Sequence, residues 1–149
     1  GIALFEPRED HGMVVSEYPD HKAVGSRIET RNSAMIQALR AEPEKPLIAE
    51  NVPNNPRIEP ETRAVLEQIG VVGLMVMALN ISDQMVGTVG FDLYDDARHF
   101  DPEMVDTART IISQVALSLE NIRLVSNATR LADQIQRVAL FGQSMQANL

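Results

Sequence analysis

The residues able to carry covalent or metal chemistry are few in this chain. It has no cysteine, which excludes a thiol nucleophile, a thiolate metal site, a disulfide and a thioether-linked chromophore such as a bilin. The three histidines, His11, His21 and His99, each stand in a polar stretch near acidic residues, where a solvated side chain is more common than a metal ligand. Neither a Gly-x-Ser-x-Gly elbow nor a Gly-Lys phosphate loop occurs. The sequence therefore predicts a protein that is not an enzyme.

The polar residues of one expected strand, residues 85–94, are the first candidates for binding. Apolar residues alternate there with Thr88, Gly90 and Asp92, which share the opposite face. Gly90 leaves room on that face, and the other two offer polar groups. The alternative is that Thr88 packs in the core and that Asp92 is solvated near the end of the strand.

Methionine and arginine supply the remaining candidate contacts. Flexible thioethers can line an adaptable apolar pocket, although methionine at strand spacing is more often core. Arginines in an acidic chain can receive an anionic group, the alternative being surface pairing with neighbouring glutamates. The candidates are Met75, Met77, Arg27, Arg31, Arg57 and Arg63.

These residues must be positioned by a central hairpin over residues 69–94. A nearly continuous apolar run, too short to cross a membrane, is followed by the turn residues Asn80, Ser82 and Asp83 and then by the alternating strand. The rest of the chain must cover the two faces of this hairpin. At 149 residues it fits one domain, and its net charge of −8 disfavours nucleic acid as a partner, because an acidic surface repels the phosphate backbone.

The other elements follow from local signals. Strands are expected over residues 2–5, 13–18 and 47–49, with irregular chain over 19–29 and a loop over 51–57. One helix should begin at Thr30, Asn32 or Ser33, and a second at Pro60 with its end at Gly70; Asp101 should cap a third. No signal peptide or membrane span is visible. We expect a cytoplasmic protein, and a fragment of a longer one because the chain opens inside an apolar strand.

The last helix shows two apolar patterns. The first, from Val105 to Ile122, is a wide stripe that suits packing on a sheet. The second has steps of four and three, which predicts a coiled coil or bundle and hence a homodimer; the alternative is that this part folds back on its own domain. Its members are Leu124, Ala128, Leu131, Ile135, Val138, Met145 and Leu149.

In order and spacing these pieces resemble a GAF domain. Residues Lys45–Val52 resemble the short strand before the family's ligand-side loop. The second strand of the hairpin begins with an apolar residue followed by glycine, Val86-Gly87, as in the family. The final helix carries Glu120-Asn121-Ile122, which resembles the end of the family's last helix. It implies an α+β fold with a GAF/PAS-like antiparallel sheet, helices on both faces and a long C-terminal helix. The GAF domain would cover residues 1–124, with residues 125–149 as a linker helix. The helix that usually precedes the first strand is missing, so residues 131–149 or a partner chain would cover that face.

The resemblance also implies a function. GAF domains bind small molecules on the sheet face opposite the terminal helices, and they signal through those helices to an output domain such as a histidine kinase. We therefore expect a sensory module of a bacterial-type signalling protein with an unidentified ligand, or else a ligand-free dimerisation module. The catalytic GAF domains that reduce free methionine sulfoxide work through cysteines, so the lack of cysteine excludes that activity. GAF domains that bind cyclic nucleotides carry an Asn-Lys…Phe…Asp-Glu signature. This chain matches that signature poorly, which counts against cyclic nucleotide binding.

Overall fold

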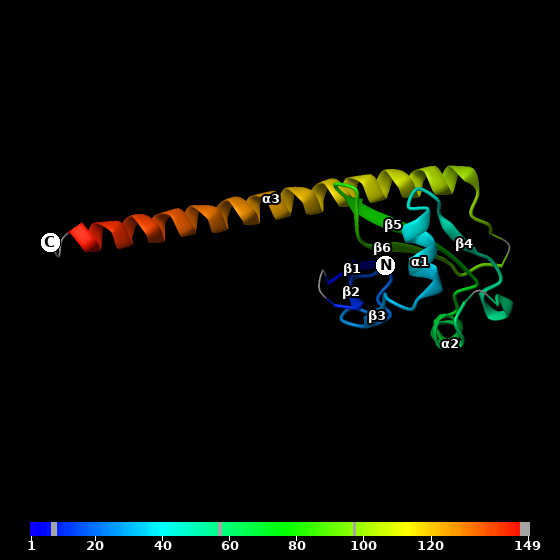
Figure 1. Ribbon diagram of the computed structural model, residues 1–149. Helices are drawn as coiled ribbons and strands as arrows, with labels where there is room; N and C mark the ends of the chain where they lie inside the picture. Colours follow the sequence, from blue (N-terminus) through cyan, green and yellow to red (C-terminus); the bar gives the residue numbers. More distant parts are fainter. Residues whose placement is uncertain (7–8, 57, 97, 147–149) are drawn as a thin grey trace. The chain divides into compact units, whose positions relative to one another are not determined.

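The computed structural model describes residues 1–6, 9–56, 58–96 and 98–146, with side chains described as far as Val138. Six strands form one antiparallel sheet in the order β3-β2-β1-β6-β5-β4 (Figure 1). The strands are β1 (Ile2–Phe5), β2 (His11–Ser16), β3 (Arg27–Glu29), β4 (Leu47–Ala49), β5 (Gly73–Ile81) and β6 (Gln84–Leu93). The helices are α1 (Ala34–Ala41), the 3-10 turn η1 (Val52–Asn54), α2 (Pro60–Gln68) and α3 (Pro102–Gln146). The expected α+β fold with a long C-terminal helix is confirmed.

The hairpin of β5 and β6 lies at the centre of the sheet, as its hydrophobicity predicts. Every residue of β5 except Asn80 is buried. Ser82 and Asp83 join the two strands with backbone φ angles of 49° and 62°. Positive φ at both turn positions matches the right-handed twist of the flanking strands, which is why short polar residues occupy this turn.

The ends of the helices follow their capping residues. The Ser33 hydroxyl accepts a hydrogen bond from the Ile36 amide, and the Asp101 carboxylate accepts one of 2.8 Å from the Met104 amide. Pro60 opens α2, and Gly70 follows its end with φ of 78°. The Ser33 and Asp101 side chains thus each satisfy a backbone N–H that a helix N-terminus leaves without a partner.

Two expectations about irregular chain were wrong. Residues 27–29 form strand β3, which pairs with His11, Gly12 and Met13 of β2. Only Ile28 is apolar in this short strand, so its sequence shows no alternation. The loop over residues 51–57 contains η1, whose Val52 is fully buried.

The sheet separates two layers of side chains. On one side, which we call the α1 face, Leu74, Val76 and Ala78 of β5 pack with residues of α1, η1 and the loops beside α2, among them Leu39 and Val52. The side chains of Met75 and Met77 alternate with these and point to the other side, the α3 face. There Met75 lines a cavity with Met104 and Ala108 of α3.

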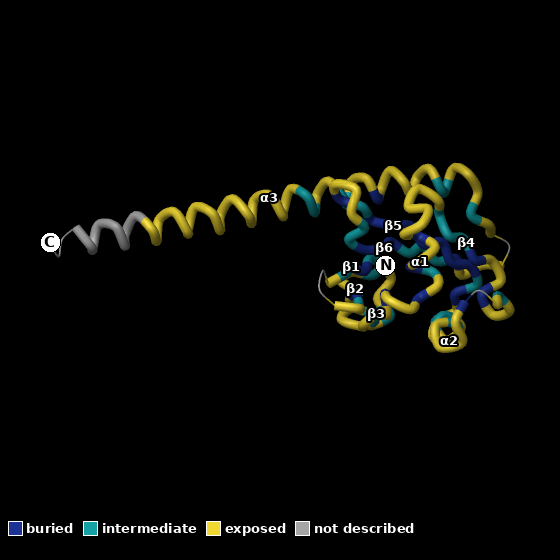
Figure 2. Tube along the Cα trace, viewed as in Figure 1, coloured by how far each residue is buried: buried dark blue, intermediate teal, exposed yellow. Residues whose placement is uncertain are grey.

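Helix α3 runs without interruption from Pro102 to Gln146 and belongs to two compact units. Residues 1–112 form the first unit, and residues 113–149 form the second. Nearly all side chains of 117–138 are exposed, which Figure 2 shows as a yellow stretch of helix. Within the described residues no helix is long and apolar enough to cross a membrane. The division into residues 1–124 and 125–149 stays a prediction.

Candidate functional site

Thr88, Gly90 and Asp92 lie on the α1 face, because they pair across the hairpin with Ala78, Val76 and Leu74 in turn. Thr88 is buried, between Ala78 on one side and Ala3 on the other. A Cβ added at Gly90 would meet nothing closer than a Leu74 methyl carbon at 4.0 Å, so this residue does leave space on the face.

Asp92 is a half-buried carboxylate at the end of this row. Burial raises its pKa above the usual value, and electrostatic interactions with the Gly1 ammonium and with His21 act in the opposite direction. The neighbour across the strand pair, Leu74, has no side-chain hydrogen-bonding group. The charge of Asp92 is therefore costly here and would be stabilised by a cation.

Met75 and Met77 cannot line the same pocket as the Thr88 row, because they lie on the α3 face. Met75 forms part of a cavity of about 340 Å³ with Phe91, Phe100, Met104 and residues around the start of α3. Sulfur and aromatic side chains make that cavity apolar, whereas Arg98, Asp101 and Glu103 are its charged members. The structure thus divides the predicted contacts between two sides of the sheet.

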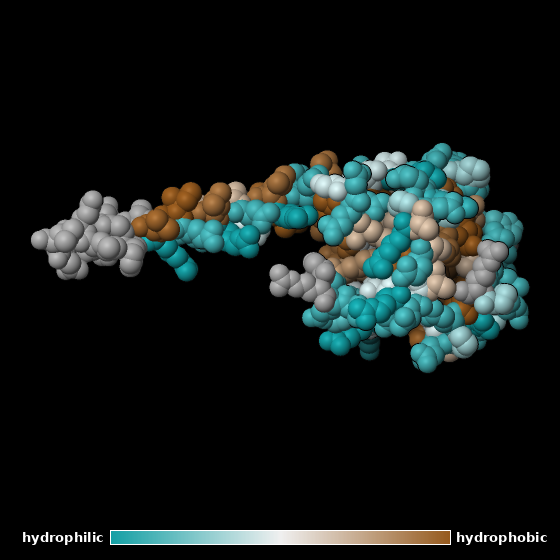
Figure 3. All heavy atoms as spheres, in the orientation of Figure 1, coloured by the Kyte–Doolittle hydropathy of each residue, from teal (hydrophilic) through white to brown (hydrophobic). Residues whose placement is uncertain are grey.

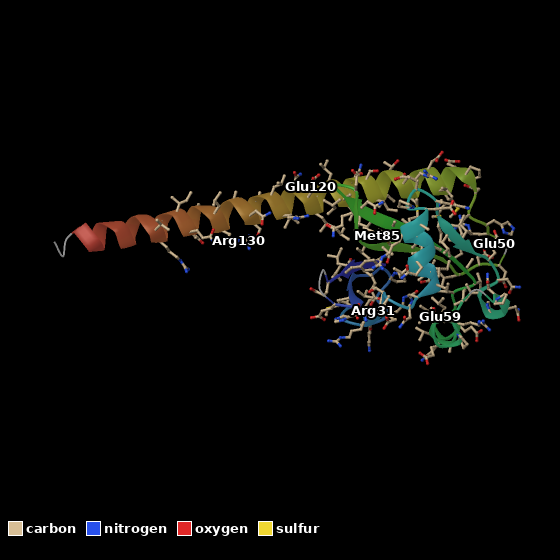
Figure 4. The ribbon with its side chains drawn as sticks, viewed as in Figure 1. Arg31, Glu50, Glu59, Met85, Glu120 and Arg130 are labelled. Carbon is tan, nitrogen blue, oxygen red and sulfur yellow. The ribbon has the colours of Figure 1, made fainter. Side chains whose placement is uncertain are left out.

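The three candidate arginines that the structure describes, Arg27, Arg31 and Arg63, are not gathered around one point. Arg31, labelled in Figure 4, is exposed and forms an ion pair of 2.7 Å with Asp10. Arg27 is exposed on β3, and Arg57 lies outside the described residues. Arg63 points into its own loop, where Nη2 donates to the Asn55 and Ile58 carbonyl oxygens at 2.9 and 2.8 Å. Its Nε is buried and has no hydrogen-bond partner among the described residues.

Replacing Arg63 with alanine is expected to lower the free energy of unfolding by about 2 kcal/mol, since two hydrogen bonds from a charged group are lost. These bonds fasten the loop between η1 and α2. Urea unfolding measures the change, with the exposed Arg40→Ala as the matched control. Equal stability of the two variants would show that Arg63 does not hold the loop.

The three histidines have different neighbours. His11 contacts Glu9 at 2.9 Å, His99 contacts Glu50 at 3.5 Å, and the His21 ring lies 6.0 Å from the Tyr94 ring. Among the described residues, no group of three or more histidine or acidic side chains is arranged to hold a metal ion.

A second cavity, of about 420 Å³, lies beside Gly1 and the end of β6. It is lined by residues 16–18 and 89–94 together with Gly1, Ile2, Phe100, Met104 and Ile111. Sequence reasoning did not identify Glu17, Tyr18 or Tyr94 as part of any site. Only the order of the strands brings the end of β2 opposite the end of β6, and no local pattern reveals that order.

The GAF domain family model matches residues 2–119. The chain belongs to the GAF family. The matched residues include Gly87, Phe91 and Asp101, so the resemblance to a GAF domain that was drawn from the sequence is confirmed. A search of curated proteins finds no match.

Solved GAF domains share this fold at low sequence identity. The GAF domain of a two-component sensor histidine kinase from Bacillus halodurans is 15% identical with a TM-score of 0.68, over 84% of this chain and 82% of that one. The blue-light absorbing form of the Thermosynechococcus elongatus PixJ GAF domain is 17% identical with a TM-score of 0.65, over 85% and 76%. A GAF domain/HD domain protein from Geobacter sulfurreducens is 11% identical with a TM-score of 0.61, over 83% and 80%. As a GAF domain, the chain is a sensory or regulatory module.

Proposed function

We propose that this GAF domain is a non-catalytic sensor that dimerises through α3 and passes its signal along that helix to an output domain of the same polypeptide. The observation that carries the proposal is the second part of α3, where apolar side chains on an unbroken helix are exposed. Leu117, Leu124, Leu131, Ile135 and Val138 are 57–72% exposed. Within this stretch of helix, hydrophobic side chains gather along one side (Figure 3).

The spacing of these residues selects a second copy of this chain as the partner. Positions 117, 124, 131 and 138 recur every seven residues and carry leucine or valine, which is the d position of a heptad. The a positions are then Asn121, Ala128 and Ile135. A single asparagine among apolar a positions is typical of parallel two-stranded coiled coils, where it fixes the register. A parallel pair would place both output domains at the same end of the dimer.

Signalling through this pair requires a ligand that binds two arrangements of the helices with different affinity. The open space at Gly90, beside the polar groups of Thr88 and Asp92, supports a small molecule on the α1 face. A cytoplasmic location and a histidine kinase as output fit this proposal.

One observation favours a second candidate, a GAF domain without ligand that serves dimerisation and spacing. Leu74, Val76 and Ala78 of the α1 face are already covered by a continuous apolar cluster that includes Leu39 and Val52. If that cluster leaves no room for a ligand, only the helix pairing remains as a function.

Native mass spectrometry of the freshly purified protein, compared with its denatured mass, separates these candidates. We expect a dimer that carries a small excess mass, and we expect Gly90→Phe to remove the excess, because the added ring fills the open space on the α1 face. The matched control is Gln84→Phe, which adds the same ring at an exposed position of the same strand. Bare dimers would favour the module without ligand, and a monomer would overturn the proposal.

A further inference from the structure

The second unit of the chain carries a row of arginines on an exposed stretch of helix. Residues 113–149 contain three basic residues, Arg123, Arg130 and Arg137, and two acidic residues, Glu120 and Asp133. Their charge is therefore +1, and residues 1–112 carry −9, which together give the chain's total of −8. The basic part of this acidic protein is thus its second unit.

The three arginines, which we call the arginine row, follow nearly one line along the helix. They are seven residues apart, which is about 10.5 Å along the axis, so the row is about 21 Å long. Each occupies the c position of the heptads whose a and d positions form the apolar seam. At 100° per residue, the row lies about 130° around the helix from that seam. Figure 3 shows that hydrophilic and hydrophobic side chains occupy different sides of this stretch. A partner on the row would therefore leave the seam accessible.

The positive charges of the row are not neutralised within the chain. All three arginines are exposed, Arg130 being labelled in Figure 4, and none forms an ion pair among the described residues. Asp133 is three residues from Arg130 and four from Arg137, the spacings at which helical ion pairs form, yet neither pair is present. In the first unit, by contrast, Arg31 and Lys45 each contact a carboxylate. The guanidinium groups of the row thus remain available to a partner outside the chain.

The residue type and the spacing indicate the chemistry of that partner. A guanidinium group binds a carboxylate through two parallel hydrogen bonds, which the ammonium group of lysine does not offer. A second helix with carboxylates along one side has the same rise per residue, so it can meet all three arginines at once. A nucleic acid strand carries a charge about every 3.4 Å, a density that three arginines neutralise only in part and that the charge of residues 1–112 repels.

We propose that the arginine row of α3 binds an acidic helix of a partner protein, whose carboxylates lie along one side of that helix. One such helix would bind to each chain. The inference goes beyond the sensory role and requires neither a ligand on the α1 face nor pairing of two α3 helices.

The first test compares two labelled peptides by fluorescence anisotropy in about 50 mM salt, where screening of exposed charges is weak. Each has about 28 residues of alanine, glutamine and glutamate, a length that is helical in water. In the aligned peptide the glutamates recur in steps of three and four and share one side; in the control peptide the same number is spread around the helix. We expect the aligned peptide to bind at least about fivefold more tightly, with one peptide per chain. Equal affinities, or tighter binding of duplex DNA than of the aligned peptide, would overturn the proposal.

The second test replaces all three arginines of the row with glutamine, a good helix former. Binding of the aligned peptide should weaken at least about tenfold, because three charged contacts are lost. The matched control removes the same charge from exposed positions of the first unit, through Lys22→Gln, Arg27→Gln and Arg40→Gln. This control should bind as the unmodified protein does. Equal weakening by both variants would mean a response to net charge alone and would overturn the proposal.

Circular dichroism and light scattering on the same samples separate this inference from the proposed dimer. The glutamine variant of the row should keep the helix content and the molar mass of the unmodified protein, because the row lies outside the seam. If the unmodified protein is a monomer that binds the aligned peptide, the dimer is excluded and the arginine row is supported. If it is a dimer that binds both peptides equally, the arginine row is excluded and the dimer is supported.

Discussion

Gly87→Ala is expected to destabilise the protein by about 3 kcal/mol, the upper part of the range for overpacking a core. Gly87 lies in β6 opposite Leu4 of β1, and a Cβ at this position would collide with the carbonyl oxygen of Ala3. The Leu4 Cα would lie at 3.2 Å from the same atom. Both neighbours are backbone, so no side-chain rotation can relieve the collision and β1 itself must move.

The consequences extend beyond one contact because the β1–β6 pairing joins the two halves of the sheet. Strands β3, β2 and β1 lie on one side of it, and β6, β5 and β4 lie on the other. Urea unfolding measures the loss, and thermal unfolding should show a decrease in Tm of roughly 10 °C for a chain of this size.

Gly90→Ala provides the matched control on the same strand. Its added Cβ has no neighbour closer than 4.0 Å, and alanine restricts the unfolded chain more than glycine does. Its stability should change by less than about 1 kcal/mol. If both variants lost the same stability, the cause would be a general effect of replacing glycine in β6 and not the approach of β1.

Leu131→Lys combined with Ile135→Lys is expected to convert the proposed dimer to a monomer. Both side chains are exposed within one chain, at 57% and 62%, and both would be central in a coiled-coil seam. Two buried ammonium groups on each helix would cost several kcal/mol of association free energy. Light scattering coupled to size exclusion gives the molar mass directly.

Ser126→Lys is the control for added charge, because position 126 lies on the outer side of the same heptads. It should leave the mass unchanged. Asn121→Ile should act in the opposite direction, since an apolar residue at this a position strengthens association while permitting other registers and larger assemblies. A double-lysine variant with the mass of the unmodified protein would exclude the heptads as an interface.

The sequence contained enough information for most of the framework. A run such as residues 73–81 can be covered on both faces only at the centre of a sheet, and Ser33, Pro60 and Asp101 mark helix starts through local capping geometry. Strand β3 could not be predicted, because its three residues gain their structure from pairing with β2 and carry no pattern of their own.

The candidate site was predicted less well because its members depend on long-range geometry. The alternation of β6 predicted that Thr88, Gly90 and Asp92 share one face of the strand. The strand register confirms that they lie on one face, opposite Ala78, Val76 and Leu74 of β5. The same alternation in β5 sends Met75 and Met77 to the other face, but a continuously apolar strand does not reveal which set faces which layer. The partners of Arg31 and Arg63 lie in loops whose positions no local signal predicts.

Because α3 is one unbroken helix from Pro102 to Gln146, the number of residues between two positions on it determines the angle between their side chains. A helix turns by about 100° per residue, so each heptad position in residues 117–138 keeps a fixed angular relation to the others in that stretch. Seven residues change this angle by only about 20°, whereas one or two residues would turn the apolar seam away from its direction. Relatives that signal in the proposed way should therefore differ in the length of this helix by multiples of seven residues.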